Sequence, residues 1–278
     1  MSQQSDRAYF GPYMLVRPLG RHQLADRFLA LHVRRQSSHI VYRFEPCRDR
    51  AERRRFLSAF ETLGSLRQAH LLAVEQFSFG SQARGWMVSP YPGNQDGLVT
   101  LRALLDLKGG RMGPFEAERA MTQLLEAAAF AQDRGLAHGA ISSGDVLVDR
   151  HGSLLIEAYG LERMLAGDDA GEDDAVRLET DSIVRLGYEC LTGLEAGDAP
   201  LPPSRAVRRL EKRWDAWFER AFDPIGGFES AGQALAALQT IDQPSEAAVG
   251  ASRSPVKVML DRIRPASTRT SAGEGEAG

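Results

Sequence analysis

The sequence predicts an α+β protein with two unequal lobes, a small lobe of antiparallel strands with one helix and a larger lobe that is mainly helical. Two observations lead to this prediction. Short runs that mix apolar, aromatic and β-branched residues dominate the chain up to Tyr91, whereas apolar residues at helical spacing dominate from Thr100 onward. Strands followed by helices, with one hairpin interposed, are typical of an α+β chain, and 278 residues suffice for two such units.

The small lobe is expected to contain five strands and one helix. The strands are predicted over Tyr13–Leu19, Arg27–Val33, His39–Phe44, Leu71–Phe79 and Gly85–Tyr91, separated by turn-forming residues. The helix is predicted over Ala51–Leu66, because Phe56, Phe60 and Leu63 recur at helical spacing there. Pro90-Tyr91-Pro92-Gly93 is a strong breaker of regular structure, which places the lobe boundary after Tyr91.

The large lobe is expected to contain several helices around one hairpin. The helices are predicted over Ala117 to Ala128, Ile183–Leu191 and Val207 to Ala221, with a last one that Ser230 and Gln233 cap and that runs to about Thr240. The hairpin joins Val146–Val148 to Leu154–Ile156 through a turn that contains Gly152.

The domain organisation that follows has four parts. Residues 1–11 are expected to be an N-terminal extension, 12–91 the small lobe and 92–241 the large lobe. Residues 242–278 are mostly Ala, Ser, Gly, Pro, Thr and Arg, a composition typical of a disordered tail or a linker.

Composition and charge exclude several classes of function. The formal net charge of −3 argues against a nucleic-acid or membrane surface that acts through bulk charge. No apolar run has the length of a membrane-spanning helix, and the N-terminus lacks a signal pattern. Cys47 and Cys190 are too few for a disulfide framework or a metal site, so both are expected to be free thiols. Together these features favour a cytoplasmic protein.

Several motifs, in order along the chain, resemble the domain of bacterial serine/threonine protein kinases. They are Leu19-Gly20 with Phe28 and Ala30, the strand Ile40-Val41-Tyr42-Arg43, the stretch Gly135 to Val148, the stretch Leu155 to Leu161, Leu186 to Gly193, and Ala221 to Phe228. The stretch Gly135 to Val148 aligns without gaps on the catalytic loop of that family, and the resemblance covers roughly residues 12–240. It implies the two-lobed protein-kinase-like fold.

The resemblance also implies where each catalytic group of a kinase would stand in this chain. The ATP-binding lysine is replaced by Arg43, and no lysine occurs before Lys108. The glutamate that pairs with this lysine falls at Ala59, the catalytic aspartate at Ala140 and the principal metal-binding aspartate at Ala158. Asp145 stands at the position of the metal-binding asparagine, where it is either a cation ligand or a turn residue.

Two loops of the chain also differ from the pattern of the family. Gly20 remains in the loop that covers the phosphates, but His22 and Ala25 occupy the other glycine positions, and the His22 side chain would crowd a phosphate. Between Gly160 and Ser182 no counterpart of the Ala-Pro-Glu element is found, so the platform for a peptide substrate is expected to be missing.

These departures predict a pseudokinase that cannot transfer phosphate, because the positions that stabilise the transition state carry the wrong side chains. It is expected to bind a protein partner, such as an active kinase or another signalling component, with weak or no ATP binding and no magnesium. One alternative is a divergent ATP-binding kinase or kinase-fold transferase that uses Arg43, Asp145 and, after a register shift, Glu157. Another is a purely structural domain whose task lies in its tail or in oligomerisation. In the tail, Ser267, Thr270 and Ser271 beside arginines are either candidate phosphorylation sites or part of a spacer without a partner.

Overall fold

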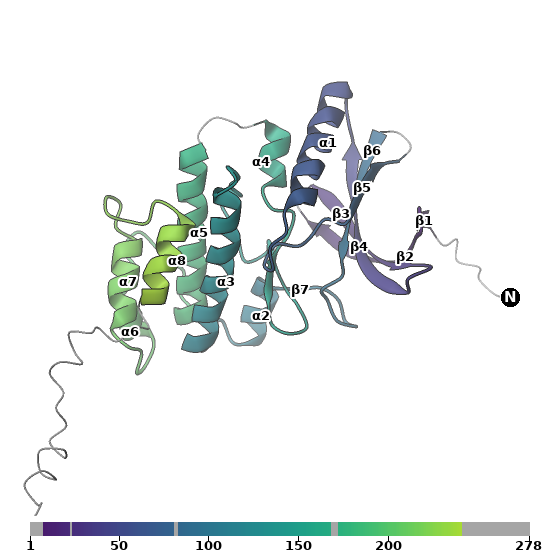
Figure 1. Cartoon of the computed structure of the whole chain (residues 1–278). Helices are drawn as coiled ribbons and strands as arrows, with labels where there is room; N and C mark the ends of the chain where they lie inside the picture. The colour runs from purple at the N-terminus through teal and green to yellow at the C-terminus, as the bar shows by residue number, and fades with distance from the viewer. Residues whose placement is uncertain (1–7, 23, 81–82, 168–171, 241–278) are drawn as a thin grey trace, which may run out of the picture. The chain divides into compact units, whose positions relative to one another are not determined.

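The small lobe is a six-stranded antiparallel sheet with one helix, in a computed structural model that describes residues 8–22, 24–80, 83–167 and 172–240. The strands lie in the order β1-β2-β3-β4-β6-β5 (Figure 1). They span Tyr9–Phe10 (β1), Tyr13–His22 (β2), Ala25–His32 (β3), Ser37–Pro46 (β4), Gln76–Phe79 (β5) and Arg84–Pro90 (β6), and helix α1 spans Arg50–Ser65. The sheet therefore begins inside the segment expected to be an N-terminal extension.

The two faces of this sheet pack against different partners, because successive side chains of a strand point to opposite faces. One face carries a buried cluster formed by Tyr13, Ala30, Val41 and Val88. The other face packs on α1, where the ring of Phe44 lies edge-on to that of Phe56 with their centroids 5.4 Å apart. Strand β4 therefore directs its even-numbered residues toward α1 and its odd-numbered residues toward the outer cluster.

The large lobe is built around two long helices. The elements are β7 (Val99–Thr100), α2 (Leu101–Leu107), α3 (Pro114–Gln132), β8 (Val146–Val148), β9 (Leu154–Ile156), α4 (Leu161–Ala166), α5 (Glu172–Thr192), α6 (Pro203–Ala206), α7 (Arg213–Ala221) and α8 (Ala231–Thr240). Helix α3 contacts both α5 and α8, and short strands β7, β8 and β9 form a second sheet (Figure 1). Gly187 of α5 faces the buried Met121 of α3, so that the two helices approach closely.

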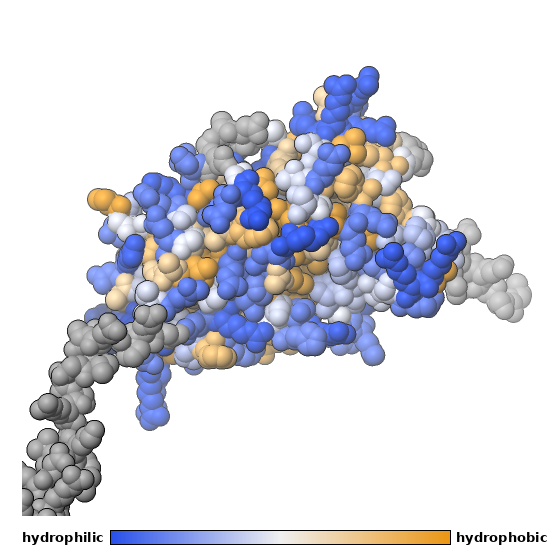
Figure 2. Space-filling model, viewed as in Figure 1, coloured by the Kyte–Doolittle hydropathy of each residue, from blue (hydrophilic) through white to orange (hydrophobic). Residues whose placement is uncertain are grey.

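Burial of apolar faces explains why these segments form regular elements. Helix α1 begins behind Asp49, whose carboxylate accepts a hydrogen bond from the Glu52 backbone N–H at 2.8 Å. Its Phe56 and Phe60 are buried, while the basic residues of its first turn are exposed. On the face shown in Figure 2, hydrophilic side chains are interspersed with hydrophobic ones, as expected for amphipathic elements that bury one side.

Most predicted elements are confirmed, and the hairpin of β8 and β9 has the predicted bounds. Three differ, each for a physical reason. The segment around Leu71 does not join the small sheet, because the Leu72 N–H donates to the Ile156 carbonyl of β9 at 3.0 Å. The helix predicted from Val207 begins only at Arg213, after Arg209 adopts a left-handed φ of 63°. Helix α5 begins earlier than predicted, since acidic residues favour a helix N-terminus.

The remaining expectations concern the ends of the chain and its membrane character. The compact unit that contains both lobes ends at Thr240, and residues 242–278, with Ser267, Thr270 and Ser271, lie outside the described residues. Among the helices that the structure describes, none has the length and apolar character needed to span a bilayer. Cys47 and Cys190 are free.

Candidate functional site

The candidate site lies where the small lobe meets the loop before β8 and the end of β9. The loop is held in place by backbone contacts, since the Glu157 N–H donates to the Asp145 carbonyl at 2.9 Å. The Ser142 hydroxyl and N–H both donate to Asp145 Oδ2, at 2.7 and 2.8 Å, which closes a turn. Asp145 and Glu157 therefore project from adjacent backbone segments of the large lobe.

Glu157 is the centre of a buried polar network. Its side chain is 0% exposed, and its carboxylate accepts hydrogen bonds from Arg27 Nη1 at 2.9 and 3.2 Å. The Tyr42 hydroxyl donates to the same carboxylate at 2.7 Å. Arg27 lies on β3 and Tyr42 on β4, so a carboxylate of the large lobe is bound by two side chains of the small lobe.

His22 adds a second link between the lobes. Its Nε2 lies 3.2 Å from Asp145 Oδ1 and 3.7 Å from Glu157 Oε2. Burial opposes ionisation of Asp145, but hydrogen bonds from His22 and Ser142 outweigh it and hold the pKa of this carboxyl well below its usual range. We call His22, Arg27, Tyr42, Asp145 and Glu157 the cleft network.

The cleft network extends to a desolvated tyrosine. Tyr42 is fully buried, and burial together with the neighbouring Glu157 carboxylate raises the pKa of its hydroxyl well above the ordinary value. The hydroxyl therefore stays protonated and acts as a donor. Because Arg27 Nη2 also lies 3.4 Å from the Leu19 carbonyl, the guanidinium joins Glu157 to the backbone of β2.

The three positions expected to lack catalytic groups carry methyl side chains, as the sequence states. Ala59 is buried on α1, Ala140 is exposed in the loop, and Ala158 is partly buried directly after Glu157. Ala158 has a left-handed φ of 46°, a conformation that costs a non-glycine residue about 1 kcal/mol or more. No carboxylate stands at any of these three positions, and the nearest acid in sequence to Ala158 is already bound by Arg27.

Arg43 lies on the face of β4 opposite to that of Tyr42, which corrects the expected placement of this residue. Arg43 Nη2 donates to Asp26 Oδ2 at 3.0 Å, and its guanidinium lies 4.8 Å from the ring centre of Phe28. Arg43 and Asp145 are therefore not brought together. The reason is the two-residue period of a strand, in which a shift of one residue exchanges the two faces.

A second buried acid, absent from the sequence-based prediction, supports the loop from below. Glu179 of α5 accepts hydrogen bonds from the Tyr159 hydroxyl at 2.6 Å, from Gln132 Nε2 at 2.9 Å and from the His138 N–H at 3.3 Å. Burial raises the pKa of its carboxyl to about 7. Burial also lowers the pKa of His138, which favours the neutral form of its ring.

The segment that follows the loop is short. Helix α4 has six residues and lies between Gly160 and Gly167, which have left-handed φ values of 65° and 71°. Helix α4 contacts α1 of the small lobe, as Figure 1 shows. Residues 168–171 lie outside the described residues, and α5 begins at Glu172.

The sequence-based prediction missed Arg27 and Tyr42 as site residues. A usable signal was present for Tyr42, because Tyr42-Arg43-Phe44-Glu45 alternates apolar and charged residues and so places Tyr42 and Phe44 together on the buried face. For Arg27 the signal was weaker. An arginine inside an apolar strand needs a buried acid, and only the fold brings residues 27 and 157 together.

Comparisons with known proteins define the fold. No family model matches the chain, and no curated protein matches it. Among solved structures, the kinase domain of PknI from Mycobacterium tuberculosis superposes with a TM-score of 0.63 at 20% sequence identity, over 87% of this chain and 100% of that one. The chain therefore has a protein-kinase-like fold, which confirms the predicted fold class.

Proposed function

We propose that this chain is a catalytically inactive protein-kinase-like domain that works by binding a protein partner in signalling. The observation that carries the proposal is the cleft network. Arg27 and His22, both from the small lobe, supply the positive and hydrogen-bonding groups that meet Glu157 and Asp145. Phosphoryl transfer needs metal ligands beside the nucleotide phosphates, and Asp145, which stands at one of those ligand positions, is bound by His22.

Magnesium and ATP, which the fold implies, do not fit the residues present. Mg²⁺ requires near-octahedral oxygen ligands, but the Glu157 carboxylate is bound by Arg27 and Tyr42, and Asp145 by His22 and Ser142. No group of three side chains suited to a metal ion occurs among the described residues. Because a metal would have to break a buried ion pair, its binding would cost several kcal/mol.

The alanines support the same proposal from the chemistry of the missing groups. A methyl group at Ala140 cannot accept a proton from a substrate hydroxyl, and one at Ala158 cannot bind a metal. Each missing contributor is worth several kcal/mol of transition-state stabilisation, so their joint loss removes useful catalysis. The partner that this proposal implies is a protein, such as an active kinase or another signalling component in the bacterial cytoplasm.

Thermal shift with nucleotide tests the proposal. The full chain should unfold at the same temperature, within about 1 °C, with and without millimolar ATP and either magnesium or manganese, because a ligand that does not bind the native state cannot stabilise it. A metal-dependent rise of several degrees would favour the alternative of an ATP-binding kinase. Incubation with γ-labelled ATP should leave the chain and a generic protein substrate unlabelled.

A matched variant makes an unexpected positive result interpretable. If label is transferred and the chain is a divergent kinase, Asp145→Ala should abolish the transfer. The control is Asp149→Ala, which removes an acid in the turn of the hairpin and should leave the transfer unchanged. Deleting residues 242–278 and repeating a partner pull-down separates an interaction through the domain from one through the remainder of the chain.

A further inference from the structure

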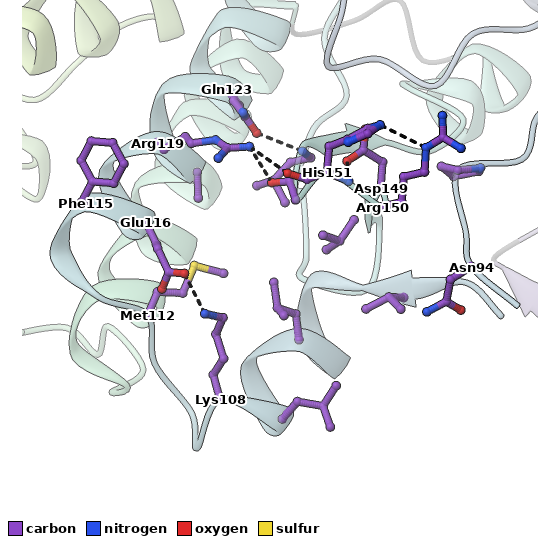
Figure 3. A pocket seen from close by; sticks show the side chains of 18 residues that line it. Asn94, Lys108, Met112, Phe115, Glu116, Arg119, Gln123, Asp149, Arg150 and His151 are labelled. Atoms are coloured by element: carbon purple, nitrogen blue, oxygen red, sulfur yellow. Dashed lines mark hydrogen bonds and ion pairs between the residues drawn. The ribbon is translucent and has the colours of Figure 1, made fainter. Parts of the chain in front are cut away.

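A cavity on the large lobe lies away from the cleft network. Its volume is about 500 Å³, within the usual range of ligand sites. Residues of α2, α3 and the β8–β9 hairpin line it, and Figure 3 shows Lys108, Met112 and Arg119 around this space, with the Phe115 ring and the Arg150 guanidinium at its outer edges. None of the five residues of the cleft network belongs to this lining.

Part of the lining of the cavity is apolar. Leu104, Met112, Val148 and Leu154 contribute aliphatic surface. Leu107 and Phe115 also line it and are 81% and 78% exposed. Two large apolar side chains so exposed on the lining of one cavity offer apolar surface to another molecule.

The acidic and basic side chains of the cavity differ in their bonding partners. Both acids accept hydrogen bonds: Glu116 from Lys108 Nζ at 2.8 Å, and Asp149 Oδ1 from the backbone N–H groups of residues 151 and 153. Arg119 donates only to backbone carbonyls, of His151 at 3.4 Å and Gly152 at 3.1 Å. Arg150 Nε donates to the His151 ring.

Neither Arg119 nor Arg150 forms an ion pair with a carboxylate of the described residues. Arginine presents its donors in a planar fork that matches a carboxylate. The cavity thus combines apolar side chains with two guanidinium groups that form no close ion pair with a carboxylate of the described residues, although Arg119 is near enough to Glu116 to help lower the pKa of its carboxyl. Its electrostatic complement is an acidic group carried beside an apolar one.

We infer that this cavity is a docking site for a short peptide segment of a partner protein, in which one or two acidic residues flank a large apolar side chain. The apolar side chain enters between Leu107 and Phe115, and the carboxylates meet Arg119 and Arg150. A peptide fits better than a compact small molecule, because the exposed apolar and cationic groups continue beyond the enclosed volume. This inference rests on the proposed function and names the chemistry of its partner.

The test uses the full-length chain and a displayed library of random 12-residue peptides. Peptides that bind the wild-type chain are selected over repeated rounds, without counter-selection against any variant. Those that survive should be enriched in Asp and Glu close to Leu, Ile or Phe. The best of them, made with a fluorescent label, is titrated by anisotropy against wild type and variants.

Matched variants distinguish specific binding at this cavity from nonspecific binding of the peptide elsewhere on the surface. Arg150→Glu should weaken binding about tenfold or more, whereas Arg134→Glu, at the opposite end of α3, should change it less than about twofold. Leu107→Ser should weaken binding about fivefold or more, and Leu201→Ser, another exposed leucine, should have little effect. Thermal unfolding of each variant should match wild type, since all four residues are at the surface.

Three outcomes would overturn the inference: no peptide is enriched, the enriched peptides lack acidic residues, or the Arg150→Glu variant binds them as well as wild type does. These failures are distinct from failure of the proposed function. Phosphate transfer from labelled ATP would refute that function whatever the peptides do. A partner protein whose binding is insensitive to both cavity variants would refute only the docking site.

Discussion

Removing Arg27 should destabilise the domain far more than removing another arginine of the same sheet. In Arg27→Met, the Glu157 carboxylate stays buried and loses both hydrogen bonds from the guanidinium, which leaves the Tyr42 hydroxyl as a donor and His22 Nε2 at 3.7 Å. Breaking a buried ion pair by removing one partner costs about 3–5 kcal/mol. For a domain of this size, about 2–4 °C per kcal/mol, the melting temperature should fall by about 6–20 °C.

The control is Arg43→Met. Arg43 also pairs with an aspartate, but both side chains are more than a third exposed, at 37% for Arg43 and 34% for Asp26. Exposed pairs contribute about 0–1 kcal/mol, so this variant should lose about 1 kcal/mol or less. Equal losses for the two variants would show that burial of the Arg27 pair does not matter.

A double-mutant cycle then isolates the interaction. Glu157→Met alone should also cost several kcal/mol, because Arg27 is left without its counter-charge. The double variant, Arg27→Met with Glu157→Met, leaves only the Tyr42 hydroxyl unsatisfied, at a cost of about 1–3 kcal/mol. Urea unfolding at pH 7 should therefore give a coupling energy of about 2 kcal/mol or more. Single losses that add within about 0.5 kcal/mol would refute the direct pair.

Three further predictions concern other sites. Ala140→Asp combined with Ala158→Asp should still give no transfer from labelled ATP, because the cleft network stays intact; label above the wild-type background would contradict this. Since burial raises the pKa of Glu179 to about 7, above the unfolded value of about 4.3, the folded state keeps a proton that the unfolded state releases between those pH values. The free energy of unfolding of the wild type should thus fall as the pH rises through this window, whereas that of Glu179→Gln should not. In urea unfolding, the variant should therefore become more stable relative to wild type by up to about 3 kcal/mol between pH 4.5 and pH 7.5. A difference between the two proteins that does not change with pH would refute the assignment. Gly187→Ala should destabilise the domain by about 1 kcal/mol in urea unfolding, because the added Cβ would lie 2.5 Å from Met121 Cγ, at a cost of about 1–3 kcal/mol that the higher helix propensity of alanine partly offsets. In a Met121→Ala background the same substitution should stabilise the domain. A stabilising effect in the wild-type background would contradict the close packing of α5 on α3.

The fold was predictable because its elements are locally specified. The hairpin of β8 and β9 combines two apolar runs with a turn that holds Gly152 at a φ of 77°, and both runs have the predicted bounds. Helix α1 has an apolar stripe and a capping aspartate in sequence. Such signals depend on neighbours a few residues apart, so one sequence suffices to detect them.

The candidate site was less predictable because its contacts are long-range. The expected absences at Ala59, Ala140 and Ala158 follow from the alignment and remain predictions about activity. Arg43 was expected to face the cleft, but its neighbour Tyr42 does so instead. The resemblance predicted the strand correctly but did not determine which of its residues point to which face. The pairs Arg27–Glu157 and His22–Asp145 join residues separated by 130 and 123 positions, and no local pattern reports such a meeting.

The shortness of α4 has a consequence for how such a domain can be controlled. Kinase activation loops are commonly switched by a phosphate group added to a hydroxyl within them. From Gly160 to Glu179 this chain contains no serine, threonine or tyrosine. The first hydroxyl after that stretch, on Thr180, is buried and donates to the Val176 carbonyl at 2.8 Å. An upstream kinase therefore finds no acceptor between Gly160 and Glu179, so a phosphate added within this stretch cannot switch the domain.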